Sequence, residues 1–167
     1  MNHIPGPTPG LLPIVRNIRP KAKIVRVEYS ISTKTGCALT WRIFTDCARW
    51  HRFTNAYRRI EWRGEPWVPG SRLQIEIVRP VVATQDRVIT ICTPPRCVAW
   101  INHVMGYTME QWVLFDPDAG GGTRVSTWIE ITGADLEGHN IEKMVAKFAA
   151  DWFINFGAEC DRMAEGR

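Results

Sequence analysis

The sequence predicts an α+β fold, in which a curved antiparallel sheet of seven strands packs around one long C-terminal helix. Three patterns indicate this fold. Residues 23–33 alternate apolar and polar side chains, which is typical of a half-buried strand. Residues 56–133 hold six further segments with the same period of two, separated by turn residues. Residues 136–163 instead carry apolar side chains at helical spacing. The expected order of elements is therefore β-α-α-β6-α.

The first strand and two short helices make up the N-terminal part of this prediction. In residues 23–33 the side chains that share the apolar face are Val25, Val27, Tyr29 and Ile31. The stretch GCALTWRIFTD, residues 36–46, groups its apolar side chains as a short helix would and should end near Asp46. CARWHRF, residues 47–53, could form a second short helix. We expect Asp46 to brace this turn and His51 to be a surface or packing residue.

The six following strands are expected to form a meander. They are residues 56–62, 71–80, 83–93, 96–105, 107–117 and 120–133. Proline and glycine in GEPWVPG, residues 64–70, and the glycines of DAGGGT, residues 118–123, mark the turns. Consecutive strands joined by such short turns pair antiparallel.

The C-terminal segment, residues 136–163, should be a single amphipathic helix. Its apolar stripe is Ile141, Val145, Phe148, Trp152, Phe156 and Cys160. A bent sheet needs its concave apolar face covered, and this helix is the element available for that role. Because a straight helix cannot fill a strongly curved surface, we expect a cavity between the helix and the sheet.

The length of 167 residues fits one domain, which we place at residues 23–165. Residues 1–22 contain five prolines, which argue against a helix or a central strand, so this segment is expected to be an extended arm. No apolar run reaches the ~18 residues of a membrane-spanning helix, so no integral membrane segment is expected.

Charge and cysteine content exclude several classes of function. The net charge is +4, but the basic residues form no run and no nucleic-acid-binding motif, so no nucleic acid partner is expected. The cysteines are Cys37, Cys47, Cys92, Cys97 and Cys160. Their spacing matches no metal site, and five reduced thiols in a cytoplasmic protein are the simplest interpretation. No P-loop or dinucleotide fingerprint is present, so we expect neither a metal nor a cofactor.

Strand pairing predicts which side chains face the cavity. With Gly106 and Tyr107 at the hairpin tip, Met105 pairs with Thr108, Asn102 with Gln111, Trp100 with Val113 and Val98 with Phe115. Across the glycine turn, Val113 pairs with Thr127, Phe115 with Val125 and Gln111 with Ile129. A slip of one residue in either turn would invert a strand.

The expected wall of the cavity is largely apolar, with a few polar groups to orient a ligand. The candidate ligand-binding residues are Tyr29, Trp100, Asn102, Gln111, Val113, Phe115, Thr127, Ile129, Phe148, Trp152 and Phe156. Asn102, Gln111 and Thr127 could instead satisfy each other or a buried water molecule. The aromatic residues of the final helix are core residues first and ligand contacts second.

The same pairing places Trp112 opposite Trp128 on the convex face, which should be wet. An apolar patch on such a face usually marks an interface. We therefore expect a second copy of the chain, forming a homodimer through Trp112 and Trp128, or the proline-rich arm to cover it. The alternative is an isolated ring pair shielded by arginine side chains such as Arg124.

Several segments, in this order and spacing, resemble the START/SRPBCC superfamily, whose fold is called the helix-grip fold, and in particular its polyketide cyclase/dehydrase-like members. They are YSISTKTGCALTWRIFTDCARWHRF, PGSRL, RCVAWINHVMG, QWVLFDPDAGGGTRVSTWIEITG and the final helix, together about residues 24–163. The resemblance implies a pocket for lipids, polyketides or other small apolar molecules. Related sequences often carry histidine at the position of Gln111 and polar or acidic groups at those of Thr127 and Ile129.

Three functions follow as hypotheses. The first is binding, with transport as an extension of it, of a hydrophobic small molecule such as a lipid or polyketide. The second is a cyclase or dehydratase, although the expected pocket offers no histidine or carboxylate for proton transfer and His103 should face outward. The third is a protein-interaction module acting through the tryptophan patch. No catalytic residue can be assigned from the sequence, and binding is the favoured hypothesis.

Overall fold

The computed structural model describes residues 23–133, 136 and 140–166, so the expected arm at residues 1–22 lies outside the described residues. The elements are β1 (Ile24–Thr33), α1 (Cys37–Thr45), the 3₁₀ helix η1 (Cys47–Arg52), β2 (Tyr57–Arg63), β3 (Arg72–Ile77), β4 (Ala83–Thr93), β5 (Cys97–Val104), β6 (Tyr107–Pro117), β7 (Thr123–Gly133) and α2 (Ile141–Glu165). The predicted element order and the α+β fold class are confirmed.

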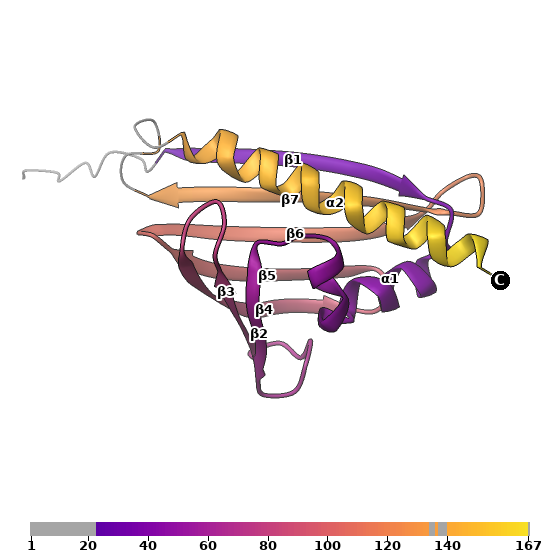
Figure 1. Ribbon diagram of the computed structural model, residues 1–167, viewed down its shortest axis with the longest axis horizontal. Helices are drawn as coiled ribbons and strands as arrows, with labels where there is room; N and C mark the ends of the chain where they lie inside the picture. Colours follow the sequence, from indigo (N-terminus) through magenta and orange to yellow (C-terminus); the bar gives the residue numbers. More distant parts are fainter. Residues whose placement is uncertain (1–22, 134–135, 137–139, 167) are drawn as a thin grey trace, which may run out of the picture.

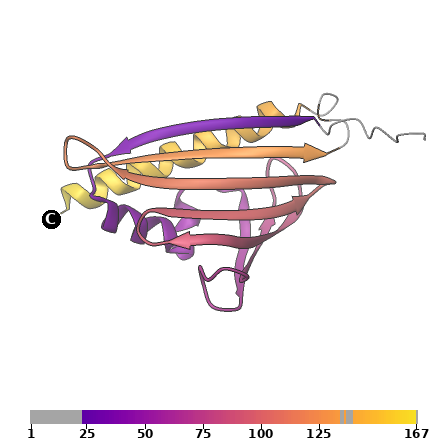
Figure 2. The ribbon, with the colours of Figure 1, turned by 180° about the vertical axis from the view of Figure 1, so that it is seen from behind.

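The seven strands form one antiparallel sheet in the order β1-β7-β6-β5-β4-β3-β2. The meander from β2 to β7 follows the chain, and β1 completes the sheet by pairing with β7. Helix α2 lies across one face of the sheet, with α1 and η1 at one end of that face (Figure 1). From the opposite side the strands lie in front of the helices (Figure 2). The apolar side chains at alternate strand positions therefore face α2.

An aromatic cluster joins α1 to the sheet and to α2. Phe44 of α1 is 1% exposed, and its ring meets Phe115 of β6 edge-on at 5.2 Å between centroids. The same ring meets Trp152 at 5.8 Å and Phe156 at 5.8 Å, both edge-on from α2. Edge-to-face pairs of this kind stabilise the packing beyond the burial of apolar area. Phe44 therefore anchors α1 where the three elements meet.

The β5–β6 hairpin corrects the predicted register. The tip is formed by Met105 and Gly106, with φ angles of 52° and 80°, and not by Gly106 and Tyr107. Two positive φ angles match the mirror-image turn whose twist suits a two-residue hairpin. The observed partners are Val104 with Tyr107, Asn102 with Met109, Trp100 with Gln111 and Val98 with Val113.

The observed register of β5 against β6 differs from the predicted one by two residues, so each side chain keeps its predicted face. The β6–β7 register is as predicted, including Gln111 opposite Ile129 and Val113 opposite Thr127. The set of side chains that faces α2 is therefore the predicted one, although its members lie at different heights along the sheet.

Helix α2 begins at Ile141, five residues later than the predicted start at 136. Asn140, the residue before it, has a left-handed backbone with φ 49° and ψ 29°. A left-handed residue interrupts a right-handed helix. The helix therefore does not extend back through Asn140 to Leu136, although the apolar spacing includes Leu136. Leu136 is buried in a turn instead.

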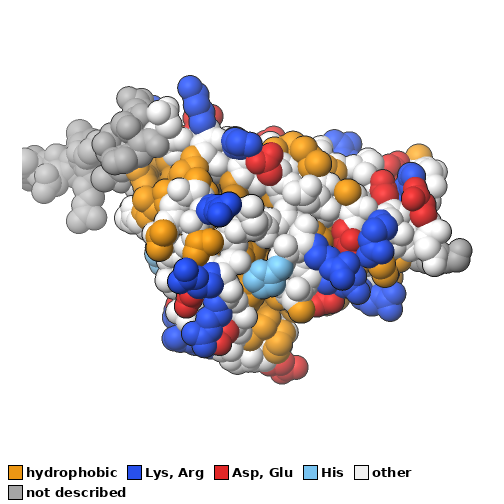
Figure 3. Space-filling view, viewed as in Figure 1, with side chains coloured by type: hydrophobic (Ala, Val, Ile, Leu, Met, Phe, Trp, Pro, Cys, Tyr) orange, Lys and Arg blue, Asp and Glu red, His pale blue; other side chains and the backbone are white. Residues whose placement is uncertain are grey.

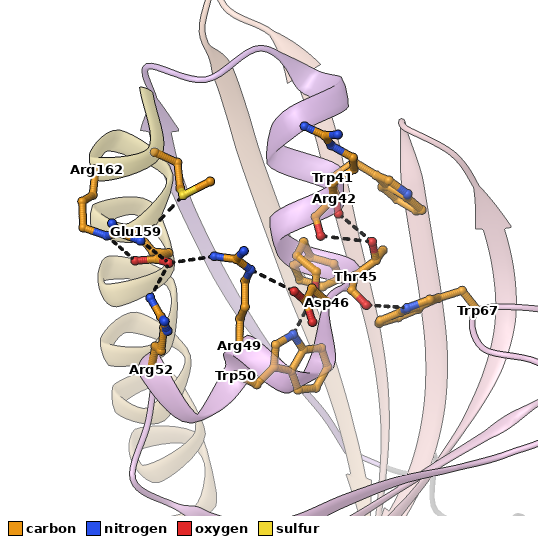
Figure 4. Close-up of polar contacts among 12 residues, drawn as sticks. Trp41, Arg42, Thr45, Asp46, Arg49, Trp50, Arg52, Trp67, Glu159 and Arg162 are labelled. Carbon is orange, nitrogen blue, oxygen red and sulfur yellow. Dashed lines mark hydrogen bonds and ion pairs between the residues drawn. The ribbon is translucent and has the colours of Figure 1, made fainter. Parts of the chain in front are cut away.

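Glu159 ties η1 to α2 (Figure 4). Arg162 donates to this carboxylate from Nε and Nη2, each at 2.9 Å, and Arg49 and Arg52 of η1 donate at 3.1 and 3.2 Å. The hydrogen bonds from Arg162 are the main cause of the lowered pKa of Glu159. Arg49 also donates to Asp46 at 2.8 Å, which fits the expected bracing role of that residue.

The chain passes closely beside itself where β1 ends and β7 begins. The hydroxyls of Thr33, Thr35, Thr40 and Thr123 form a buried hydrogen-bonded group at this end of the sheet. A Cβ atom on Gly122 would lie 2.0 Å from the carbonyl oxygen of Thr33, so only glycine fits there without a backbone shift.

Within residues 23–133, 136 and 140–166, no helix is both long and apolar enough to cross a membrane.

Candidate ligand-binding site

A cavity of about 110 Å³ lies between α2 and the concave face of the sheet. This volume is several times the roughly 10–15 Å³ that one water molecule requires. Ile141, Met144, Val145, Phe148, Ala149 and Trp152 line it from α2. Strands β2 to β7 line the other side, and Phe44 and Trp50 close one end. The predicted space between helix and sheet is therefore present.

The two ends of the cavity differ. Arg79, Pro80 and Met105 are lining residues that are exposed to solvent, so the mouth lies between the β3–β4 loop and the tip of the β5–β6 hairpin. Hydrophobic side chains gather at this end of the molecule, near the start of α2 (Figure 3). Phe44, Trp50 and Trp100, which line the other end, are each at most 2% exposed. The cavity thus runs from a solvent-exposed mouth to a buried inner end.

Six of the candidate ligand-binding residues line the cavity. They are Trp100, Asn102, Gln111, Ile129, Phe148 and Trp152. The other five, Tyr29, Val113, Phe115, Thr127 and Phe156, lie in the surrounding packing. No observation tests whether any of the eleven contacts a ligand, so that part stays a prediction.

The five residues outside the lining have packing partners of their own. Phe115 lies under α1, with its ring 5.3 Å from that of Trp41. Tyr29 of β1 packs at 6.4 Å from Phe153 of α2. Phe156 lies past the cavity along α2, against Phe44. Alternation along a strand predicts the face of the sheet but not the part of that face over which the helix leaves a space.

Two of the three expected polar groups satisfy each other. Gln111 donates from Nε2 to the Thr127 hydroxyl at 3.0 Å, and that hydroxyl donates to the Trp112 carbonyl at 2.7 Å. Asn102 differs, because its Nδ2 is buried without a hydrogen-bond partner among the described residues. The indole N–H groups of Trp100 and Trp152 are likewise buried and unpartnered. A buried donor left without an acceptor costs about 1–3 kcal/mol.

Arg87 of β4 is a cavity residue that the sequence interpretation did not select. It is 8% exposed, and its guanidinium lies over the rings of Trp50 and Trp100 at 5.7 and 5.0 Å. Its Nε and Nη2 donate to Gln85 Oε1 at 3.2 and 3.0 Å. A signal was available, because Gln85, Arg87 and the buried Ile89 share one face of their strand by alternation.

The groups around Arg87 supply no compensating negative charge. Burial raises the pKa of the Tyr57 hydroxyl, and the charge of Arg87 and its hydrogen bond to Tyr57 offset only part of this effect. Burial likewise raises the pKa of the Cys47 thiol to about 12. Both groups are therefore protonated and neutral at pH 7. Among the described residues, no carboxylate forms an ion pair with Arg87.

The lining contains no obvious machinery for proton transfer. Among the described residues that line the cavity there is no histidine, aspartate or glutamate. His103 is exposed and pairs through Nδ1 with the Thr108 hydroxyl at 3.0 Å, so it faces away from the cavity as predicted. Across the part of the chain that the structure describes, no group of three metal-ligating side chains lies together.

The convex tryptophan pair is present and partly shielded. The rings of Trp112 and Trp128 stack with centroids 5.6 Å apart and planes 12° from parallel. Arg26 covers the Trp128 ring at 5.2 Å, in the shielding role that the sequence suggested for Arg124. The Trp112 indole donates to Glu110 at 3.0 Å. No observation tests whether a second copy covers the pair.

Comparison with known proteins identifies the fold. No family model and no curated protein sequence matches the chain. Among solved structures, Zhui aromatase/cyclase from Streptomyces sp. R1128 has a TM-score of 0.74 at 14% identity, covering 85% of this chain and 96% of that one. A START superfamily protein from Mycobacterium smegmatis has a TM-score of 0.66 at 8% identity, covering 83% and 98%. Norcoclaurine synthase from Thalictrum flavum has a TM-score of 0.67 at 8% identity, covering 83% and 94%. The chain therefore has the helix-grip fold of the START superfamily, as its resemblance to that superfamily implied.

Proposed function

We propose that this protein binds a small hydrophobic molecule in the cavity between α2 and the sheet. The observation that carries the proposal is the cavity itself, which is open at one end, walled mainly by aromatic and aliphatic side chains, and supplied with unpartnered N–H donors. Ligand sites commonly combine apolar walls with a few polar groups in this way. The helix-grip fold, shared with a START superfamily protein and an aromatase/cyclase, supports it.

Binding accounts for the unpartnered donors better than an empty cavity does. The indole N–H groups of Trp100 and Trp152 and the amide of Asn102 would each gain an acceptor from a bound molecule. Burial of the ligand's apolar surface contributes roughly 25 cal/mol per Å² of area removed from water. A compact ligand suits the volume, since pockets for drug-sized molecules occupy about 300–1,000 Å³.

Catalysis of a cyclase type is the weaker hypothesis on these residues. Proton transfer needs a group whose pKa lies near the working pH. The described lining offers two arginines, two tyrosines and amides but no histidine or carboxylate, and Gln111 is engaged with Thr127. Neutral donors of this kind can orient or polarise a carbonyl oxygen, which is a binding role in the first instance.

A matched pair of α2 variants tests the proposal. Ala149 is 5% exposed and lines the cavity, whereas Ala158 is exposed on the same helix. Ala149→Leu should reduce binding of the compact neutral fluorophore 2-naphthol at pH 7 at least roughly tenfold, because the added carbon atoms occupy the cavity. Ala158→Leu should bind the fluorophore like the wild type. If the wild type does not bind, or Ala149→Leu binds equally well, the proposal is wrong.

We further propose a cytoplasmic location, reduced cysteines, and a homodimer through Trp112 and Trp128 or an arm that covers this pair. Arg26 over the Trp128 ring and Glu110, which accepts a hydrogen bond from Trp112, already contact this pair.

A further inference from the structure

The buried guanidinium of Arg87 is the feature that the proposed function leaves unexplained. An arginine is effectively always charged, and moving an uncompensated charge out of water costs several kcal/mol, by order of magnitude. Arg87 is 8% exposed and lines the cavity, and among the described residues it has no anionic partner. A protein that only needed to enclose an apolar molecule would gain stability from an apolar residue here.

The surroundings of Arg87 compensate for its burial only in part. The rings of Trp50 and Trp100 attract the cation, and each such contact contributes about 0.5–2 kcal/mol. Gln85 accepts two of its hydrogen bonds through one neutral oxygen, which fixes the plane of the guanidinium. Tyr57 and Cys47 are neutral at pH 7 because burial raises the pKa of each. The positive charge itself stays unneutralised.

Further donors lie beside this charge. Asn102 of β5 is the cross-strand partner of Arg87 of β4, and its Nδ2 is buried without a partner. The indole of Trp100, whose ring is 5.0 Å from the guanidinium carbon, also has an unpartnered N–H. One cation and two neutral donors therefore line the same part of the cavity. The guanidinium, the amide NH₂ and the indole N–H can all donate a hydrogen bond, and none of them can accept one. Such a set is complementary to an anion with two oxygen atoms.

The rest of the cavity defines the other part of the ligand. Between Arg87 and the mouth the walls are largely apolar, with Ile141, Met144 and Val145 of α2 on one side and Ala83, Val104 and Tyr107 of the sheet on the other. An anion small enough to be bound by Arg87 would leave this space unfilled unless it carried an apolar group. The volume of about 110 Å³ limits that group to a compact size.

We propose that the ligand is a small amphipathic carboxylic acid, with its carboxylate bound by Arg87, Asn102 and Trp100 at the inner end and its apolar part directed along α2 toward the mouth. This inference rests on the proposed function, because it requires a ligand in the same cavity. The planar guanidinium suits a carboxylate, which it can bind through two parallel hydrogen bonds.

The test compares three ligands of matched shape by isothermal titration calorimetry. They are 4-phenylbutyrate, its methyl ester, and 4-phenylbutan-1-ol. The wild type should bind the acid roughly tenfold or more tightly than either neutral compound, because the acid alone neutralises the buried cation. Arg87→Gln should lose this preference while keeping its affinity for the alcohol. Arg79→Gln, the same change at an exposed arginine of the mouth, should keep the preference.

The outcomes separate the two proposals. Binding of the neutral compounds with equal or higher affinity than the acid would overturn the carboxylate proposal and leave hydrophobic binding intact. Failure of all three compounds to bind, together with failure of the neutral fluorophore, would overturn the proposed function as well. Retention of the acid preference in Arg87→Gln would show that another group binds the carboxylate. If that variant does not fold, the comparison of acid and alcohol on the wild type still decides the question.

Discussion

Replacement of Phe44 by leucine tests whether α1 closes the cavity by packing its aromatic ring against both other layers. The ring is 1% exposed and makes edge-on contacts with Phe115, Trp152 and Phe156 at 5.2–5.8 Å. Such pairs contribute about 0.5–1.5 kcal/mol each beyond their area burial. Leucine keeps much of the apolar bulk but loses all three pairs, so Phe44→Leu should lower the free energy of unfolding by about 1.5–4 kcal/mol.

Urea unfolding followed by tryptophan fluorescence and far-ultraviolet circular dichroism measures this change. Phe148→Leu is the matched control, because Phe148 is half-buried and its one ring contact among the described residues, with Tyr57, has a centroid distance of 6.0 Å. The control should lose clearly less stability than Phe44→Leu. A loss below about 0.5 kcal/mol for Phe44→Leu, the range of surface substitutions, would refute the aromatic anchor.

Three further predictions concern the sheet, the helix and the convex face. Glu159→Gln should destabilise the protein above pH 4.5, the ordinary pKa of the carboxyl group, and this difference from the wild type should vanish as the pH falls through the lowered pKa. Urea unfolding at several pH values measures the difference. A difference in the free energy of unfolding that persists at low pH would contradict its origin in the ion pairs of Glu159. Gly122→Ala should cost about 1–3 kcal/mol in thermal or urea unfolding because its Cβ would strike the Thr33 carbonyl, whereas Gly120→Ala, with open space around it, should cost clearly less; equal effects would refute the close approach. If a second copy covers the convex pair, light scattering should give a dimer for the wild type and a monomer for Trp128→Thr, and a monomeric wild type would contradict the homodimer.

The strands were predictable because their environment is periodic. One face of the sheet meets the helices and the other meets water, so burial alternates along each strand and the period of two is visible in the sequence. In β7 the buried residues are Thr123, Val125, Thr127, Ile129 and Ile131, in strict alternation. The stacked pair of Trp112 and Trp128 followed from the same reasoning, because residues directly opposite each other share a face.

The errors arose where local backbone geometry decides the outcome. Met105 adopts a positive φ, which is uncommon for a residue other than glycine, so the hairpin tip was placed one residue too late along the chain. Asn140 has the same kind of backbone, so the helix starts directly after it and not at residue 136. Neither conformation is encoded by the hydrophobic period, which is the signal that sequence reasoning uses most.

Arg87 was missed for a different reason. Charged residues are almost always exposed, so an arginine within an alternating strand is normally assigned to the wet face. Its burial depends on Trp50 of η1 and Trp100 of β5, which lie on other elements, together with Gln85 of the same strand. The available signal for its burial was that Arg87 lies on the same face of β4 as the buried Ile89. Buried charges that break the expected pattern are therefore worth locating as candidate ligand groups.

A crystal structure of the protein grown with saturating 4-phenylbutyrate tests the central claim most directly. The account predicts density for one acid molecule between α2 and the sheet, with its carboxylate against Arg87 and Asn102 and its ring toward Met144. Side chains that fill this space completely, or an acid molecule bound only outside it, would contradict the claim that the helix and the sheet enclose a ligand site.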